Sequence, residues 1–178
     1  RVGELLQPVV EILARDHVAE RQPDAGDLPG QELGVVLGSF GDLAVDFHHT
    51  VEDVGLVIGD AVFQALGDRA GIRRYGFAVT PMDDALAEVA IDLSNRPYLV
   101  FHLPPAVESE GLFHRGIAKE FFRAFAVKGG MNLHINVKYG ENEHHILEAS
   151  YKSVGRGLKQ AVFIDNDDRG VLSTKGVL

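Results

Sequence analysis

Two copies of the pattern His-His-x-x-Glu occur in this chain of 178 residues. The first copy is His48-His49-Thr50-Val51-Glu52, and the second is His144-His145-Ile146-Leu147-Glu148. At the chain's own His and Glu frequencies, even one such pentapeptide is expected by chance only about a few hundredths of a time. Imidazole and carboxylate groups are donors for divalent metal ions, so the repeated pattern predicts a metal-binding role.

Each copy follows a strand-like stretch and precedes helix-like residues, so we expect each copy to begin a helix. On that helix the first His and the Glu are four residues apart, and the second His and the Glu are three apart. This spacing puts imidazole and carboxylate on one flank. The two adjacent imidazoles point about 100° apart, so one pair can serve two different metal ions. A single copy is more often solvated or packed; the duplication favours metal ligation.

The composition limits the classes of protein to consider. An apolar fraction of 46% with 24% charged residues is that of an ordinary globular protein. No apolar run approaches the roughly 18 residues that span a bilayer, and no signal-peptide pattern begins the chain, so we expect a soluble, cytoplasmic protein. The lack of cysteine excludes disulfides, thiolate zinc sites and a cysteine nucleophile. A formal net charge of −9 argues against nucleic acid as the main partner.

The periodicity of apolar residues predicts a mixture of helices and strands. Helical spacing predicts helices over about 1–17, 49–66, 117–127 and 145–163. Runs rich in β-forming residues predict strands over 33–37, 42–47, 74–80, 87–93, 97–103 and 131–139. Turn signals at 81–84 and 94–95 separate three of these runs, which favours an antiparallel meander or a hairpin set. Asp83-Asp84 can also be viewed as an acid–base pair, but a turn is the better interpretation.

The order strand, His-His-x-x-Glu, helix occurs twice, and aligning the copies also matches Gly59 with Gly155 and Ala65 with Ala161. Such small residues let helices pack closely. We therefore predict an internal duplication, with a first half over 1–70 and a second half over 71–178 that ends in a substrate-binding tail. Neither half has enough donors for two six-coordinate ions, so we expect sites shared between halves or between subunits.

Further motifs accompany the two copies in order over roughly residues 41 to 178. They are the segments 46–55, 65–68, 74–76, 81–86, 96–98, 120–122, 133–135, 144–149, 152 and 173–176. Together they resemble the imidazoleglycerol-phosphate dehydratase family. The resemblance implies an α+β fold of two similar α/β halves, ribosomal protein S5 domain 2-like, each with a mixed sheet covered by helices. It also implies self-association into trimers and a shell of twenty-four subunits, with active sites at subunit interfaces.

The resemblance further implies a hydro-lyase of histidine biosynthesis that converts D-erythro-imidazoleglycerol phosphate to imidazoleacetol phosphate and water. The implied cofactor is Mn²⁺, with two ions per active site. The implied metal ligands are His48, His49, Glu52, His144, His145 and Glu148, and the implied phosphate ligands are Arg74, Arg96, Lys152, Ser173 and Lys175. Dehydration needs a carboxylate to take a proton and an acid to assist the leaving hydroxyl, so Glu52 and Glu148 are the catalytic candidates.

The residues before Gly41 depart from the family pattern. The family has a further histidine ligand whose place falls near Gln22 here, and the only upstream histidine is His17, whose neighbours do not match. Divergence, truncation or an altered reading frame would each produce this departure. Whether His17, Glu120 or His134 supplies another ligand stays open, although a packed or supporting role is favoured for His134. The alternative functions are a metal-binding but catalytically impaired assembly protein and a metal-dependent hydrolase.

Overall fold

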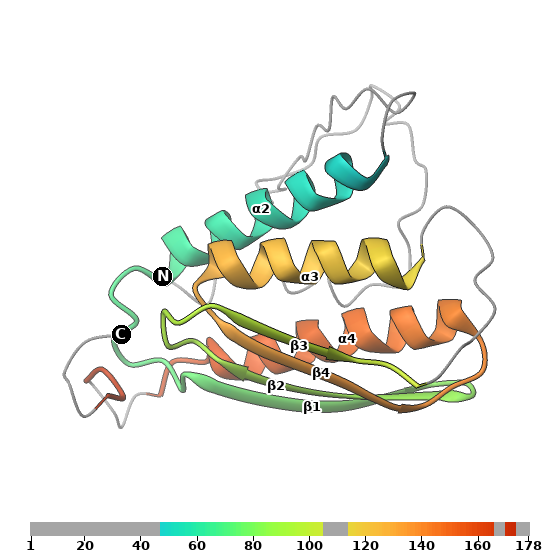
Figure 1. The fold of residues 1–178 in the computed structure, drawn as a ribbon. Helices are drawn as coiled ribbons and strands as arrows, with labels where there is room; N and C mark the ends of the chain where they lie inside the picture. The colour runs from blue at the N-terminus through green and yellow to red at the C-terminus, as the bar shows by residue number, and fades with distance from the viewer. Residues whose placement is uncertain (1–46, 105–113, 166–169, 174–178) are drawn as a thin grey trace, which may run out of the picture.

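The structure is a computed structural model that describes residues 47–104, 114–165 and 170–173 of the chain. In these ranges the elements are α2 (Phe47–Leu66), β1 (Tyr75–Met82), β2 (Ala85–Asp92), β3 (Tyr98–His102), α3 (Arg115–Gly129), β4 (Asn132–Tyr139) and α4 (Glu143–Ala161) (Figure 1). The predicted helix over 1–17 and the predicted strand over 33–37 lie outside these ranges. So does the predicted strand over 42–47, except for Phe47, which begins α2 instead. None of the described helices is long and apolar enough to cross a bilayer.

The four strands form one mixed sheet in the order β1-β2-β4-β3. β1 pairs with β2 and β2 pairs with β4 in the antiparallel sense, whereas β3 pairs with β4 in the parallel sense. The predicted hairpin of β1 and β2 is therefore confirmed, but the prediction that the third run continues a meander is wrong. β3 lies next to β4 instead, because the chain leaves β3, passes through α3 and returns as a parallel strand, and parallel pairing needs such a crossover.

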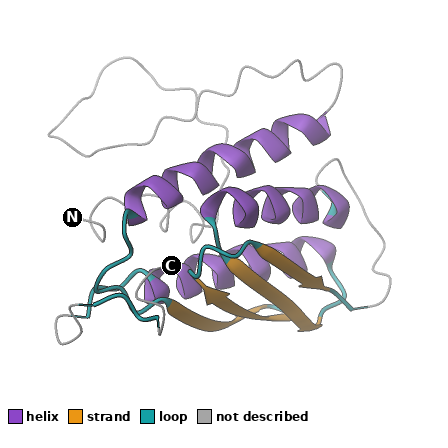
Figure 2. Ribbon diagram, turned by 60° about the vertical axis from the view of Figure 1, so that its left-hand side comes forward, coloured by secondary structure: helices purple, strands orange, loops and turns teal. Residues whose placement is uncertain are grey.

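Helices cover one face of this sheet in two layers (Figures 1 and 2). α4 packs on β1 and β2, α3 packs beside β3, and α2 packs on the far side of α3. The shared core includes Phe122, Phe125, Leu133, Ile135 and Leu158, all of them fully buried. The predicted α+β class, with a mixed sheet covered by helices, is confirmed for the described residues, which contain one complete βββαβα unit and the helix that precedes it.

The helix ends follow local sequence signals. α2 ends at Leu66, before Gly67 with a φ of 53°. α3 ends at Gly129, and Gly130 adopts the left-handed conformation with a φ of 60° that glycine tolerates best. Asn142 precedes α4 and accepts hydrogen bonds from its first backbone N–H groups, which is typical of an N-cap. The predicted helices over 49–66, 117–127 and 145–163 are thus confirmed to within about two residues at each end.

Glycines on α2 allow α2 and α3 to pack closely. A Cβ added to Gly59 would lie 2.7 Å from the Phe125 carbonyl oxygen, which is backbone and cannot rotate away. Gly59→Ala should therefore lower the free energy of unfolding by about 1–3 kcal/mol, because the overlap outweighs the better helix propensity of alanine. The measurement is urea unfolding followed by circular dichroism.

A helical glycine with room for a methyl group provides the control for that prediction. A Cβ on Gly157 of α4 would first meet Ile91 Cδ1 at 3.4 Å, an ordinary van der Waals contact. Gly157→Ala should thus leave stability unchanged or raise it by up to about 1 kcal/mol. Equal effects of the two substitutions would contradict a close α2–α3 contact.

Candidate metal and substrate site

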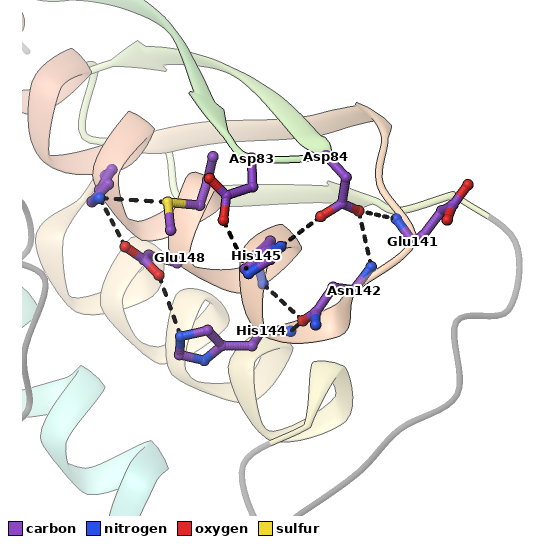
Figure 3. Close-up of polar contacts among 9 residues, drawn as sticks. Asp83, Asp84, Glu141, Asn142, His144, His145 and Glu148 are labelled. Atoms are coloured by element: carbon purple, nitrogen blue, oxygen red, sulfur yellow. Dashed lines mark hydrogen bonds and ion pairs between the residues drawn. The ribbon is translucent and has the colours of Figure 1, made fainter.

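The second His-His-x-x-Glu copy occupies the first turns of α4, as predicted. The Asn142 side-chain oxygen accepts hydrogen bonds from the backbone N–H groups of His144 (2.9 Å) and His145 (3.3 Å). Along one flank, His144 Nε2 lies 3.3 Å from Glu148 Oε2, and Lys152 Nζ lies 2.8 Å from Glu148 Oε1 (Figure 3). The Glu148 carboxylate therefore lies between an imidazole and an ammonium group, in the i, i+4 geometry that the spacing predicts.

The neighbouring imidazole, that of His145, faces the turn between β1 and β2. Its Nδ1 lies 2.5 Å from Asp84 Oδ1, and its Nε2 lies 3.4 Å from Asp83 Oδ2. The bond from His145, with further bonds from the backbone N–H groups of Glu141 and Asn142, holds the pKa of the Asp84 carboxyl well below its usual range. The same bond to Asp84 raises the pKa of His145. The predicted turn at Asp83-Asp84 is confirmed, and it also contacts a predicted metal ligand.

The first copy begins α2, and its two histidine rings are exposed. The His48 and His49 ring centroids are 6.1 Å apart, the same separation as in the second copy, although the angle between the ring planes is 86° in the first copy and 61° in the second. Glu52 Oε1 lies 3.5 Å from Arg123 Nη2 on α3. That guanidinium also pairs with Glu120, whose role as a further metal ligand the sequence leaves open.

One chain does not bring the two copies together into a closed site. α2, α3 and α4 all begin at the same end of the structure, with α3 between the other two (Figure 1). Within 47–104, 114–165 and 170–173, no group of three or more His, Asp or Glu side chains is arranged to hold a metal ion. The donor chemistry fits manganese, since each copy offers imidazole nitrogen and carboxylate oxygen without sulfur. Each copy alone offers only part of a manganese coordination sphere, so the remaining donors would have to come from outside that copy.

Two of the predicted phosphate ligands meet at a common carboxylate. Arg74 contacts Asp92 twice, with Nε 2.6 Å from Oδ1 and Nη2 3.1 Å from Oδ2, and Arg96 Nη2 lies 3.7 Å from Asp92 Oδ2. Arg74 Nη1 also donates to the Leu172 carbonyl oxygen at 2.5 Å, directly before Ser173. The hydrogen bond to Asp92 raises the pKa of Arg74. The structure thus brings Arg74, Arg96 and the segment before Ser173 together; Lys175 lies outside the described residues.

These arginines and the second copy of the motif lie at opposite ends of α4. The Arg74 backbone N–H donates to the carbonyl of Ala161, the last residue of α4, whereas His144 and His145 are in its first turn. At about 1.5 Å per residue, the two ends are about 25 Å apart. Lys152 alone among the described phosphate candidates is on the same flank as Glu148. One chain therefore separates the predicted phosphate-binding arginines from its own α4 motif by more than the length of a small substrate.

Arg74 and Arg96 differ in how much each contributes to the stability of the fold. The Arg74 side chain is 10% exposed and makes two bonds to Asp92, while that of Arg96 is 68% exposed with one longer contact. Arg74→Gln should lower the free energy of unfolding by on the order of 3 kcal/mol, because it leaves Asp92 without its main partner. Arg96→Gln should leave stability nearly unchanged. Thermal unfolding of both variants is the measurement, and equal midpoints would contradict this distinction.

Of the remaining histidines, His17 lies outside the described residues, and the structure describes His102, His114 and His134. His134 is exposed on the face of the sheet that the described helices leave uncovered, so the predicted core position is wrong, and the supporting role stays a prediction. Its neighbours Leu133 and Ile135 point to the helices, and alternation along a strand turns His134 the other way. His102 Nδ1 lies 2.9 Å from Asn136 Oδ1, and His114 caps α3 through a bond from the Gly116 N–H.

Sequence reasoning missed the residues that hold the predicted ligands in place. They are Asp84 beside His145, Asp92 between the two arginines, Arg123 beside Glu52, and Asn142 at the start of α4. Of these, Asn142 had a usable signal, since Asn directly before a helix is a preferred N-cap. Arg96 is four positions from Asp92. The other contacts join residues that are 18 to 71 positions apart, and no local pattern indicates them.

Comparison with known proteins identifies the family. A family model described as imidazoleglycerol-phosphate dehydratase matches residues 31–158. The chain is 62% identical over 138 residues to the protein of that name from Desulfosudis oleivorans, covering 78% of this chain and 71% of the relative. It is 53% identical over 148 residues to the one from Heliobacterium modesticaldum, covering 83% of this chain and 76% of the relative.

Solved structures agree with the sequence relatives. The crystal structure of imidazoleglycerol-phosphate dehydratase from Staphylococcus aureus is similar with a TM-score of 0.64 and 38% identity, over 68% of this chain and 71% of that one. The structure of IGPD from Pyrococcus furiosus in complex with (S)-C348 gives a TM-score of 0.66 and 39% identity, over 74% and 71% of the two chains. The resemblance seen in the motifs is thereby confirmed, and the chain belongs to the imidazoleglycerol-phosphate dehydratase family of hydro-lyases.

Proposed function

We propose that this chain removes water from D-erythro-imidazoleglycerol phosphate to give imidazoleacetol phosphate in histidine biosynthesis, with Mn²⁺ as its cofactor. Membership of the dehydratase family, at 62% identity to a relative of that name, is the observation that carries the proposal. The row of His144, Glu148 and Lys152 on α4 supports it, because an imidazole, a carboxylate and a cation lie side by side there.

Six side chains are the proposed metal ligands: His48, His49, Glu52, His144, His145 and Glu148. Held by these side chains, a divalent ion would supply Lewis acidity for negative charge that develops on the substrate's imidazole ring. The protein's own part is to place a carboxylate that takes or returns a proton. Glu148 is the stronger candidate, since Lys152 and His144 hold its two oxygens in a fixed direction. Glu52 is the second candidate, and its contact with Arg123 similarly limits its rotation.

The proposed phosphate ligands are Arg74, Arg96, Lys152, Ser173 and Lys175. Guanidinium and ammonium groups suit a phosphate because they donate several charge-assisted hydrogen bonds. Arg74 already holds a carboxylate, so it contributes mainly by fixing the local backbone and Asp92, while Arg96 is exposed and available to a ligand.

The active site is proposed to be shared between subunits. The distance of about 25 Å between the arginines and the α4 motif supports this, because one small substrate cannot bridge the two ends of α4 in a single chain. The lack of a closed metal cluster among the described residues of one chain points the same way. Self-association into trimers and a shell of twenty-four subunits in the cytoplasm is the proposed assembly, in which donors from neighbouring chains complete each site.

The test is an assay of the purified protein with imidazoleglycerol phosphate, after chelation and again after addition of Mn²⁺. We expect turnover to disappear on chelation and to return with about two Mn²⁺ per subunit. Bound metal without turnover would favour the alternative of a catalytically impaired assembly protein. Release of inorganic phosphate from unrelated phosphoesters would favour a hydrolase, and either result would overturn the proposal.

A further inference from the structure

Asp84 makes three contacts from the turn between β1 and β2. Its Oδ1 lies 2.5 Å from His145 Nδ1. Its Oδ2 accepts hydrogen bonds from the backbone N–H groups of Glu141 (2.5 Å) and Asn142 (3.0 Å), the two residues that lead into α4. Figure 3 shows the carboxylate between the imidazole ring and this backbone segment. Oδ2 therefore binds the backbone before α4, and Oδ1 binds the imidazole ring.

The direction of the Asp84 carboxylate is fixed by the fold and not by the side chain alone. Met82 pairs with Ala85 across the hairpin, so Asp83 and Asp84 form a two-residue turn, and Asp83 has a positive φ of 44°. The two backbone donors then fix the rotation of the carboxylate. Oδ1 therefore points toward the first turn of α4, where it contacts the His145 ring.

A carboxylate at Nδ1 determines which ring nitrogen is available to a ligand. A neutral imidazole carries one proton, and an acceptor at 2.5 Å from Nδ1 places that proton on Nδ1. The Nε2 lone pair of His145 then points away from Asp84. The carboxylate near Nε2 belongs to Asp83, at 3.4 Å, and it is 69% exposed, so it can turn into solvent when a cation approaches.

We propose that Asp84 is a positioning residue that fixes the tautomer and direction of His145 so that Nε2 is presented to the metal. The inference rests on the proposed function in one respect, namely that His145 is a metal ligand. The two imidazoles of the second copy are then oriented differently. His144 is oriented by Glu148 on the same helix, whereas His145 is oriented by Asp84, which is 61 positions earlier on the β1–β2 turn.

The test measures Mn²⁺ affinity of the full chain by isothermal titration calorimetry, without any assay of activity. Asp84→Asn keeps the shape of the side chain and an oxygen for the two backbone donors, so the turn should still form. We expect affinity to fall by about 10–100-fold, the usual effect of removing a group that orients a metal-bound histidine. Glu141→Gln is the control, because it removes the same charge from the same region and the Glu141 side chain points away from the ring (Figure 3).

Repeating Asp84→Asn in a chain that already carries His145→Ala shows whether Asp84 acts through the His145 ring or only by stabilising the turn. In His145→Ala, the further change Asp84→Asn should have almost no effect on Mn²⁺ affinity, because the ring that it orients is gone. Asp84→Ser, which keeps a short acceptor but no carboxylate, should lose as much affinity as Asp84→Asn in the otherwise unaltered chain. Thermal unfolding of each variant checks that the fold is retained.

The outcomes distinguish this inference from the function on which it rests. If the unaltered chain binds no Mn²⁺, the proposed metal site fails and this inference fails with it. If the unaltered chain binds Mn²⁺ and Asp84→Asn binds it equally well, the inference alone is overturned. It is also overturned if Asp84→Asn weakens Mn²⁺ binding by the same factor in the chain that carries His145→Ala. Asp84 would then affect Mn²⁺ affinity without acting on the His145 ring.

Discussion

Glu148→Gln is expected to lower turnover of imidazoleglycerol phosphate by about 10²–10⁴-fold, the contribution typical of a positioned acid or base. The glutamine has nearly the same shape, so it can still lie between His144 and Lys152, but it cannot accept a proton at the pH of the assay. The measurement is the steady-state rate at saturating substrate and Mn²⁺, with the metal content of the variant determined in parallel.

The matched control for Glu148→Gln is Glu88→Gln. Glu88 pairs with Lys138 at 2.9 Å between two strands, so this variant removes the same charge and an ion pair, but on the sheet. It should retain nearly the full rate. Unchanged turnover by Glu148→Gln would remove Glu148 from the catalytic role and leave Glu52 as the candidate. A lost rate together with lost manganese would instead make Glu148 primarily a metal ligand.

Two variants that are inactive alone are expected to recover activity when they are assembled together. One chain carries His144→Ala and His145→Ala, and the other carries Arg96→Gln. If each site takes its metal ligands from one subunit and its phosphate ligand from another, random mixing leaves about a quarter of the sites intact. The expected result is therefore about a quarter of the normal rate from co-expressed, differently tagged chains, measured after purification on both tags.

Arg96 is the right partner for this experiment, because its exposed side chain leaves the fold intact, whereas Arg74 is largely buried. Each variant assembled alone serves as the control and should show almost no turnover. If the mixed assemblies are no more active than the separate variants, every site draws its α4 motif and its Arg96 from the same chain. A conformational change would then be needed to bring Arg96 close to the His-His-x-x-Glu motif at the other end of α4.

The sequence allowed prediction of those features that depend on neighbouring residues. The α2, α3 and α4 helices were predicted because apolar spacing sets their buried face, and because Gly67 and Gly130 end two of them. The β1–β2 hairpin was predicted from the turn residues between its strands. The start of the second copy on a helix was predicted as well, since the pentapeptide follows a strand-like stretch and precedes helix-like residues.

Features that depend on distant residues were not predictable in this way. The parallel neighbour of β3 depends on the route of the chain through α3, which strand propensity does not contain. The surface on which His134 lies depends on which face of the sheet the helices cover. Asp84 meets His145 only because the hairpin folds over the start of α4. Such contacts require the tertiary structure, and the metal-binding chemistry that the residue types indicate stays a prediction.

The most direct measurement of the central claim is anomalous diffraction at the manganese absorption edge, from crystals of the assembled protein grown with Mn²⁺. We predict manganese peaks where 48–52 of one subunit approaches 144–148 of another, within about 2–2.5 Å of imidazole nitrogens and carboxylate oxygens. Manganese bound elsewhere, or the two segments remote from each other in the assembly with no metal at either, would contradict the claim.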